Sequence, residues 1–312
     1  MRCTLESLKL EPKQATAIAL GAFDGVHRGH QLLLARAREL AQGNGLLSAV
    51  LTFWKPPRNY LGQGKRLLLP PEEKLKLLER EVELVVIADF PKLRGLAPEE
   101  FARLLRERLH ARVVIIGADY RFGRDRIGDA ALLRKLGHKH GFRAEIVEKL
   151  KLDGEEVSAT AIREAIKAGE VERAARLLGR PPLLIGRVVH GTGRGRRLGF
   201  PTANLEVPEE LAAPESGIFT VWVELPDERR PGVLYIGRRP TFAERERSFE
   251  VYILDFAGEL YGQELRLHLL RKLREDRKFT DEAALREQIA RDVQQAREFF
   301  AVEAKAKARM QV

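Results

Sequence analysis

The stretch ATAIALGAFDGVHRGHQLLLARAREL, residues 15–40, combines one predicted strand, a turn and one predicted helix in the first half of the chain. It opens on a short apolar run of the kind that forms a buried strand, and it closes on the three- and four-residue spacing of apolar residues that forms a helix. The turn between them contains His27 and His30, together with one aspartate and three glycines. Ligands of open α/β sheets bind beyond the carboxyl ends of the strands, so this turn is a candidate binding loop.

The rest of the first half repeats the alternation of strand and helix. Apolar runs at 46–53, 82–88 and 112–118 have the composition of strands, and helical patterns occupy 71–81, 98–109 and 129–141. Two of these helices begin with proline, which fits the first helical turn. The alternation predicts a parallel sheet covered by helices on both faces, as in a Rossmann-like domain.

The pattern changes near residue 180, where a helical pair ends at Gly179 and two prolines follow it. From 183 to about 273 short alternating runs are separated by Gly and Pro, which predicts an antiparallel β-barrel. A final helix over 280–300 carries one apolar stripe. It consists of Leu285, Ile289, Val293, Ala296 and Phe300. We therefore expect an α/β domain over 1–180 and a barrel domain with a C-terminal helix over 181–312.

The composition is that of a globular protein, with 312 residues of which 44% are hydrophobic and 32% charged. No apolar run approaches the ~18 residues of a membrane span, and no signal-peptide pattern is present, so we expect a cytoplasmic protein without a membrane partner. The single cysteine, Cys3, excludes an internal disulfide. The net charge of +10 suits phosphorylated small molecules or nucleic acid, but the aromatic interleaving of a nucleic-acid platform is missing.

His27 and His30 lie three residues apart at the start of a predicted helix, which places them on the same side of its first turn. Unpaired backbone N–H groups and the positive end of the helix dipole lie there as well. Two imidazole donors added to this surface make a phosphate cradle, and Gly21, Gly25 and Gly29 allow close approach of the backbone. Two alternatives are metal ligation by the histidines with Asp24 and simple capping of the turn.

The segment HRGH at 27–30 resembles the H-x-G-H signature of nucleotidyltransferases, and GAFDGVHRGH resembles its form in bacterial FAD synthetases. The resemblance implies that ATP is bound here and that FMN is converted to FAD with release of pyrophosphate. The loop 115–129 and the segment SATAIRE at 158–164 also match this family. The resemblance assigns His27, His30 and Arg163 to catalysis. It assigns nucleotide and flavin contacts to Gly21, Phe23, Asp24, Gly29, Asp119, Phe122, Ser158 and Thr160.

Two departures from the FAD synthetase pattern motivate an alternative. Pro56 stands where the family carries the histidine of a Pro-His-Pro, and Ala159 replaces the middle serine of its S-S-T segment. Lys55 or Arg58 are candidates for the missing positive group. The alternative is a riboflavin kinase whose adenylyltransferase domain is degenerate. A basic nucleic-acid-binding protein is a second rival, which salt-dependent retention on DNA or RNA without flavin chemistry would favour.

The other informative stretch is GRVVHGTGRGRRLGFPTANL, residues 186–205. Its glycines allow a loop to wrap a polyphosphate with backbone N–H groups. Thr202 and Asn204 are two residues apart, so both side chains lie on one face of an extended segment. Their neutral oxygens suit Mg²⁺, which is usually completed by water and phosphate oxygens.

The segment GFPTAN at 199–204 resembles the signature of riboflavin kinases, and YIGRRPTF at 235–242 and SFEVYILDF at 248–256 also match that family. The resemblance implies that riboflavin is phosphorylated to FMN with MgATP, that Mg²⁺ is held at Thr202 and Asn204, and that Glu250 is the general base. It assigns substrate contacts to Gly191, Gly195, Gly199, Phe200, Pro201 and Arg274. Tyr235 stands where the family often has asparagine. The whole chain thus predicts a bifunctional flavin-cofactor enzyme whose partners are riboflavin, FMN and ATP, without nucleic acid.

Overall fold

A computed structural model describes residues 1–11, 13–62, 64–191, 193–238 and 247–310 of the chain. The chain divides into two compact units, Met1–Ala159 and Thr160–Val312.

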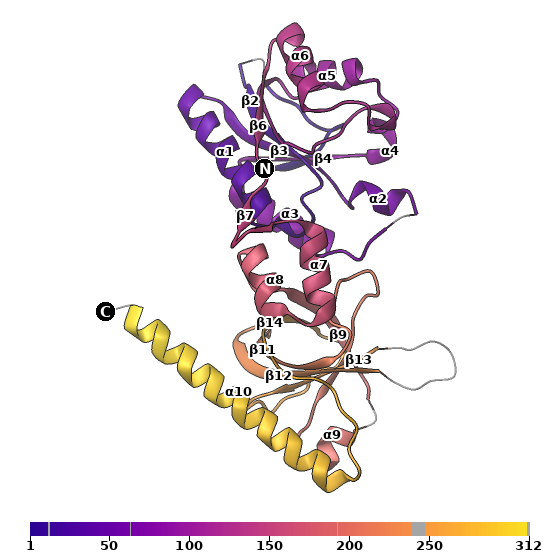
Figure 1. Ribbon diagram of the computed structural model, residues 1–312, viewed down its shortest axis with the longest axis vertical. Helices are drawn as coiled ribbons and strands as arrows, with labels where there is room; N and C mark the ends of the chain where they lie inside the picture. Colours follow the sequence, from indigo (N-terminus) through magenta and orange to yellow (C-terminus); the bar gives the residue numbers. More distant parts are fainter. Residues whose placement is uncertain (12, 63, 192, 239–246, 311–312) are drawn as a thin grey trace. The chain divides into compact units, whose positions relative to one another are not determined.

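The first unit, coloured from indigo to magenta in Figure 1, is built on a six-stranded sheet. The order of its strands is β1-β4-β3-β2-β5-β6. All of its strand pairs are parallel, which confirms the parallel sheet expected from the sequence. The strands are β1 (Arg2–Thr4), β2 (Thr16–Leu20), β3 (Leu47–Phe53), β4 (Leu84–Ala88), β5 (Ala111–Gly117) and β6 (Arg143–Val147). A small antiparallel pair, β7 (Lys151–Leu152) and β8 (Glu155–Glu156), follows the sheet.

Helices cover both faces of this sheet. Successive side chains of a strand point to opposite faces, and those of β2 are apolar on both, so each face needs a covering layer. Ala17 and Ala19 of β2 pack in one core cluster with α1 (Arg28–Asn44) and α3 (Pro71–Glu81). Ile18 and Leu20 pack in the other with α5 (Pro98–Glu107) and α6 (Ala130–His140). Short turns complete the unit: η1 (Asp24–Val26), α2 (Pro57–Tyr60), α4 (Phe90–Leu93) and η2 (Arg124–Arg126).

The strand order places β2 at the point where the topology reverses. From β2 the chain proceeds outward through β3 and β4 on one side, and it then crosses to β5 and β6 on the other. Crevices at such switch points, beyond the carboxyl ends of the strands, are where open α/β sheets bind ligands. The loop that contains His27 leaves β2 at this edge.

The second unit contains a closed barrel in the order β10-β13-β12-β11-β14-β9, with all neighbours antiparallel. This confirms the predicted antiparallel barrel, which has six strands. Its strands are β9 (Leu183–Val189), β10 (Ala203–Glu206), β11 (Gly217–Glu224), β12 (Arg229–Arg238), β13 (Arg247–Ile253) and β14 (Glu264–Arg274). Its helices are α7 (Ala159–Ala168), α8 (Val171–Leu178), α9 (Arg194–Arg197) and α10 (Glu282–Met310).

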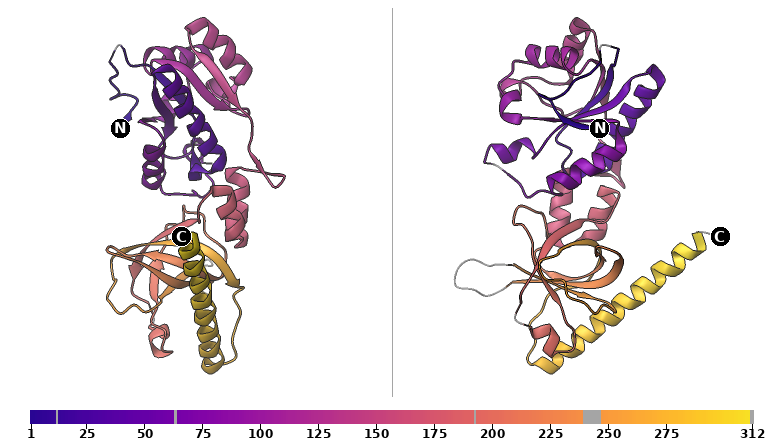
Figure 2. Two further views of the ribbon diagram at one scale, coloured as in Figure 1. Left: turned by 90° about the vertical axis from the view of Figure 1, so that its left-hand side faces the viewer. Right: turned by 180° about the vertical axis from the view of Figure 1, so that it is seen from behind.

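The final helix α10 lies along one side of the barrel (Figure 2). Val293, Ala296 and Phe300 of the predicted stripe are buried in a cluster with Ile218 and Val233 from the outward face of the barrel strands. Inward-facing residues such as Phe219 and Leu234 fill the barrel itself. The apolar stripe of the sequence therefore marks the helix face that covers the barrel wall.

The helical pair α7 and α8 belongs to the barrel unit, which differs from the boundary expected near residue 180. The division falls after Ala159, because Val171 of α8 is buried in the barrel core with Leu184 and Leu267. The sequence could not reveal this, since an amphipathic helix does not specify which neighbour covers its apolar face.

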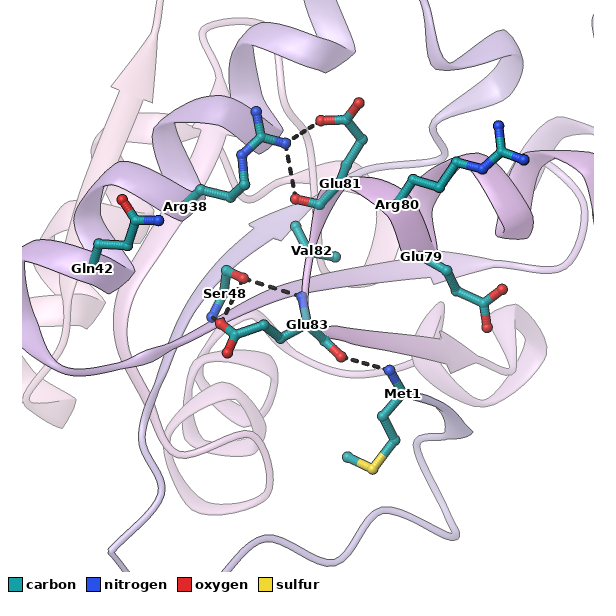
Figure 3. Close-up of a pocket in the computed structure, with 9 residues that line it drawn as sticks. All are labelled: Met1, Arg38, Gln42, Ser48, Glu79, Arg80, Glu81, Val82 and Glu83. Atoms are coloured by element: carbon teal, nitrogen blue, oxygen red, sulfur yellow. Dashed lines mark hydrogen bonds and ion pairs between the residues drawn. The ribbon is translucent and has the colours of Figure 1, made fainter.

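Two surface cavities of the first unit lie at the amino ends of its strands. One, of about 380 Å³, is lined by residues that include Met1, Ser48 and Glu83, where β3 and β4 begin (Figure 3). The other, of about 860 Å³, includes Gln14, next to the start of β2. Both are at the edge opposite to the carboxyl end of β2, so neither corresponds to the predicted binding loop.

The core of the first unit predicts a contrast between two leucines of α1. Leu34 is fully buried, whereas Leu32 is 42% exposed on the same helix. Replacing Leu34 by Ala should lower the free energy of unfolding by about 2–5 kcal/mol, because it removes packing and leaves a cavity. Leu32→Ala should change it by less than about 0.5 kcal/mol. Urea unfolding of both variants checks this, and equal losses would contradict the assigned helix face.

Candidate active sites

His27 is the N-cap of α1, and its side chain is part of the helix start. Its Nδ1 accepts a hydrogen bond from the backbone N–H of His30 at 3.4 Å, and the two rings stack with centroids 3.5 Å apart. Since Nδ1 is the acceptor, the neutral ring of His27 carries its proton on Nε2. The structure thus brings both predicted histidines together, and the capping that the sequence allowed as an alternative is compatible with a donor role for Nε2.

The turn before His27 has a strained backbone. Phe23 and Val26 adopt positive φ angles of 52° and 41°, which side chains with a Cβ rarely occupy. Phe23 is fully buried, and its ring lies 5.0 Å from that of His30. Gly29 leaves room for the ring of His27, because a Cβ at Gly29 would come within 3.3 Å of it. Strain of this kind is typical of ligand-binding turns.

Asp24 is buried with 6% exposure, and its Oδ1 accepts a hydrogen bond from the backbone N–H of Leu68 at 3.1 Å. It therefore ties η1 to the segment that leads into α3. The described residues contain no group of three or more His, Cys, Asp or Glu side chains arranged to hold a metal ion. The alternative of a metal site at His27, His30 and Asp24 has no support from this geometry.

The predicted flavin-side loop follows β5. Asp119 lies within it, with its side chain 70% exposed and 3.2 Å from Lys149 Nζ. Phe122 instead points into the core, where its ring lies 5.3 Å from that of Phe101. Gly128 is required there, because a Cβ would come within 2.7 Å of the Phe122 ring. Phe122 thus anchors the loop to the core of the first unit.

Three residues of the SATAIRE segment were predicted to contact ATP, and the point at which the chain divides into its two units, after Ala159, lies among them. Ser158 is the penultimate residue of the first unit, whereas Thr160 and Arg163 lie on α7 in the second. Thr160 is exposed and Arg163 is half-buried. Their contact with the ATP phosphates stays a prediction.

The barrel brings together the three residues predicted for phosphoryl transfer. Asn204 on β10 is directly opposite Glu250 on β13, and the Thr202 hydroxyl donates a hydrogen bond of 3.3 Å to Glu250 Oε2. Cross-strand partners share one face of a sheet, so the three side-chain oxygens gather on the outward face of the barrel wall. Tyr235, the departure noted in the sequence, is opposite Glu250 on the other side.

The glycine-rich loop folds directly against these oxygens. A Cβ at Gly191 would collide with the Asn204 amide group, and one at Gly195 would lie 2.9 Å from the Thr202 hydroxyl. Gly199 has a φ of 86°, in the region that favours glycine. Of the matched segment 235–242, positions 239–242 lie outside the described residues. The loop therefore packs directly against Thr202 and Asn204, and its contact with a polyphosphate stays a prediction.

Phe200 and Arg274, which were predicted to contact substrate, interact with other side chains of the second unit. Phe200 packs edge-on against Tyr252 with ring centroids 5.6 Å apart, and Pro201 is exposed beside it. Arg274 makes a two-fold ion pair with Asp292 of α10, at 2.9 and 2.7 Å. This pair joins the end of β14 to α10, so Arg274 holds the barrel wall and the helix together.

Sequence reasoning missed Lys74 of α3, which is 3% exposed. Its ammonium group donates to the carbonyl oxygens of Phe53 and Trp54, where β3 ends. The signal was present in the sequence, because Lys74 adjoins Leu75 and is four residues before Leu78 on the apolar stripe of the helix.

Family comparisons divide the chain in the same two parts. Residues 9–161 match the FAD synthetase family, and residues 178–300 match the riboflavin kinase family. Most of the helical pair lies outside both matches. No helix in the described ranges is long and apolar enough to cross a membrane.

Relatives match over nearly the full length. A "bifunctional riboflavin kinase/FMN adenylyltransferase" of Pseudomonas fluorescens is 39% identical over 92% of this chain and 94% of that protein, and one of Haemophilus influenzae is 36% identical over 92% and 95%. A solved structure named as a macrolide-efflux protein from Streptococcus pneumoniae has a TM-score of 0.86 and 30% identity, covering 95% of this chain and 98% of that one. Since both family matches are present, the kinase-only alternative is not favoured. The chain belongs to the family of bifunctional riboflavin kinase/FMN adenylyltransferases.

Proposed function

We propose that the two reactions occur at the two clusters described above, riboflavin phosphorylation at Thr202, Asn204 and Glu250, and FMN adenylylation at the His27 turn. The observation that carries the proposal is that Asn204 is the cross-strand partner of Glu250 and Thr202 donates a hydrogen bond to it, with the glycine-rich loop packed against Thr202 and Asn204. The family matches over residues 9–161 and 178–300 support the same assignment of each reaction to one half.

In the kinase half, the oxygen of the ribityl hydroxyl attacks the γ-phosphorus of ATP, and ADP leaves. Glu250 accepts the proton of that hydroxyl. A hydroxyl is a weak nucleophile, so a positioned carboxylate is required. The hydrogen bond from Thr202 orients the Glu250 carboxylate. Backbone N–H groups of the glycine-rich loop stabilise charge on the phosphates, and such positioning dominates phosphoryl transfer.

The donor set of the kinase half fits Mg²⁺. A threonine hydroxyl, an asparagine amide oxygen and a nearby carboxylate are the hard oxygen ligands that this ion prefers. The loop also lies against them so closely that no Cβ fits at Gly191. Thr202 and Asn204 would hold the ion, which when bound neutralises phosphate charge.

In the adenylyltransferase half, the FMN phosphate attacks the α-phosphorus of ATP and pyrophosphate leaves. The phosphate is already anionic, so this step needs no protein base. The Nε2–H of His27, the ring of His30 and the N–H groups of the first turn of α1 stabilise the charge that develops on the phosphates. The loop with Asp119 borders the carboxyl end of β5, which adjoins β2, and it is proposed to contact the flavin.

Replacing both His27 and His30 by Ala should lower FAD formation from FMN by about 10²–10³-fold, because donors to the developing charge are lost. Riboflavin phosphorylation should stay within about twofold, since the residues belong to another unit. Chromatography of the two flavin products measures both rates. His138→Ala, an exposed histidine on α6, is the matched control. Wild-type FAD formation in the double variant would remove the histidines from the site.

Glu250→Gln keeps the size of the side chain but cannot accept a proton. Its kcat for riboflavin phosphorylation should fall by roughly 10²–10⁴-fold, the usual contribution of a general base. FMN adenylylation should persist. Glu264→Gln, at an exposed carboxylate of β14, controls for loss of surface charge. An unchanged kcat would mean that Glu250 is an outward-facing strand charge only.

Asn204→Ala removes one of the two neutral oxygens beside Glu250. The Mg²⁺ concentration for half-maximal riboflavin phosphorylation should rise by roughly tenfold or more, as for other losses around a metal site. Titration with Mg²⁺ at saturating riboflavin and ATP measures this. An unaltered Mg²⁺ dependence would exclude Asn204 as a ligand.

A further inference from the structure

Lys74 is a buried cation in the first unit whose hydrogen-bond partners are backbone carbonyl groups. Its Nζ donates to the oxygens of Phe53 and, at 3.1 Å, of Trp54. Within the described part of the chain no carboxylate lies within ion-pair distance of it. A buried charge without an ion pair costs free energy of folding, so a function is the natural reason for it.

The carbonyl groups that Lys74 binds are at the carboxyl end of β3, next to the His27 loop. Gly21 donates its N–H to Leu51 of β3, and the Thr52 hydroxyl donates to the Ala22 carbonyl at 3.2 Å. The end of β3 is therefore tied to the loop at two consecutive residues. A change at the end of β3 would be transmitted to the turn that carries His27.

Lys74 also acts on the charge of this loop. Asp24 of η1 has an electrostatic attraction to Lys74 and is itself buried. A carboxylate and two carbonyl dipoles would repel a polyphosphate at this edge of the sheet, and the Lys74 ammonium group reduces that repulsion. The neighbouring elements carry other charges. On α3, Glu73 is paired with Lys76, and Glu81 at the far end of the helix is paired with Arg38 of α1. Lys55 follows β3.

We propose that Lys74 is a positioning residue for FMN adenylylation, holding the end of β3 against the His27 loop and offsetting the charge of Asp24 so that the loop accepts the ATP phosphates. This inference rests on the proposed role of the His27 turn. It also supplies a positive group near the stretch where Pro56 replaces the expected histidine. Because Lys74 acts on ATP through the His27 loop, its replacement should change mainly the KM for ATP of FAD formation.

The ionisation of Lys74 gives this role a signature. Burial lowers its pKa from 10.5 to about 8, although attraction to Asp24 opposes the shift. Its charge is therefore lost as the pH rises through about 8, and FAD formation should fall with it. The stability of the fold responds to pH in the opposite direction from FAD formation. Between pH 8 and 10.5 the unfolded chain holds the extra proton, so the contribution of Lys74 to the free energy of unfolding rises with pH.

The test compares Lys74→Met, which removes the charge, with Lys74→Arg, which keeps a charge that does not titrate below pH 12. Lys76→Met, at an exposed lysine two residues away, is the matched control. The kcat and KM for ATP of FAD formation are measured from pH 6.5 to 9.5, and circular dichroism with urea unfolding of the same samples reports on the folding of the first unit, to which Lys74 belongs. Lys74→Met should lower kcat/KM for ATP by about tenfold or more at pH 7, mainly through KM. The wild-type decline above pH 8 should be absent from Lys74→Arg.

Two results would overturn the proposal: an unchanged kcat/KM in Lys74→Met, or the same alkaline decline in the wild type and Lys74→Arg. If Lys74→Met fails to fold, the comparison of the wild type with Lys74→Arg decides alone. Loss of FAD formation in the His27, His30 double variant with none in Lys74→Met would reject only the role of Lys74. Normal FAD formation in the histidine variant would reject the proposed site itself.

Discussion

The hydrogen-bond register of two strands, β2 and β10, fixes where each group of candidate catalytic side chains lies. β2 is paired with β3 and β5 at once, so its carboxyl end cannot shift without breaking two ladders, and Gly21 continues the pairing into the loop. β10 is paired with β9 and β13, which places Asn204 opposite both Val189 and Glu250. A slip of one residue in β10 would turn Thr202 and Asn204 to the other face of the wall.

The two proposed sites differ in charge, and the chemistry proposed for each accounts for the difference. Riboflavin enters the kinase reaction with a neutral hydroxyl, and the proposed base of that half is a carboxylate, Glu250, to which the Thr202 hydroxyl donates a hydrogen bond. FMN brings its own anionic phosphate, and the turn around His27 presents imidazole rings and backbone N–H groups instead. The one buried carboxylate of that turn, Asp24, is turned toward the Leu68 N–H and is attracted by Lys74. In the proposed account, the carboxylate of one site and the donors of the other each match the nucleophile of their reaction.

Periodicity alone was sufficient to predict the two fold classes, because buried strands and amphipathic helices leave distinct spacings. The predicted helix over 71–81 coincides with α3, and the first barrel strand, β9, begins at Leu183, where the alternating runs were predicted to begin. The edge strands β1 and β6 were missed, since short or partly exposed strands carry a weak apolar signal. The motifs located His27, Thr202 and Glu250, but the inward orientation of Phe122 and the ion pair of Arg274 depend on tertiary packing that no local pattern encodes.

If each half has a nucleotide site of its own, calorimetric titration of the full-length protein with a non-hydrolysable ATP analogue and Mg²⁺ will detect both sites. Two molecules of the analogue should bind per chain, and one should remain when both His27 and His30 are replaced by Ala. Binding of a single molecule to the wild-type chain, lost in that same variant together with riboflavin phosphorylation, would contradict the presence of two sites.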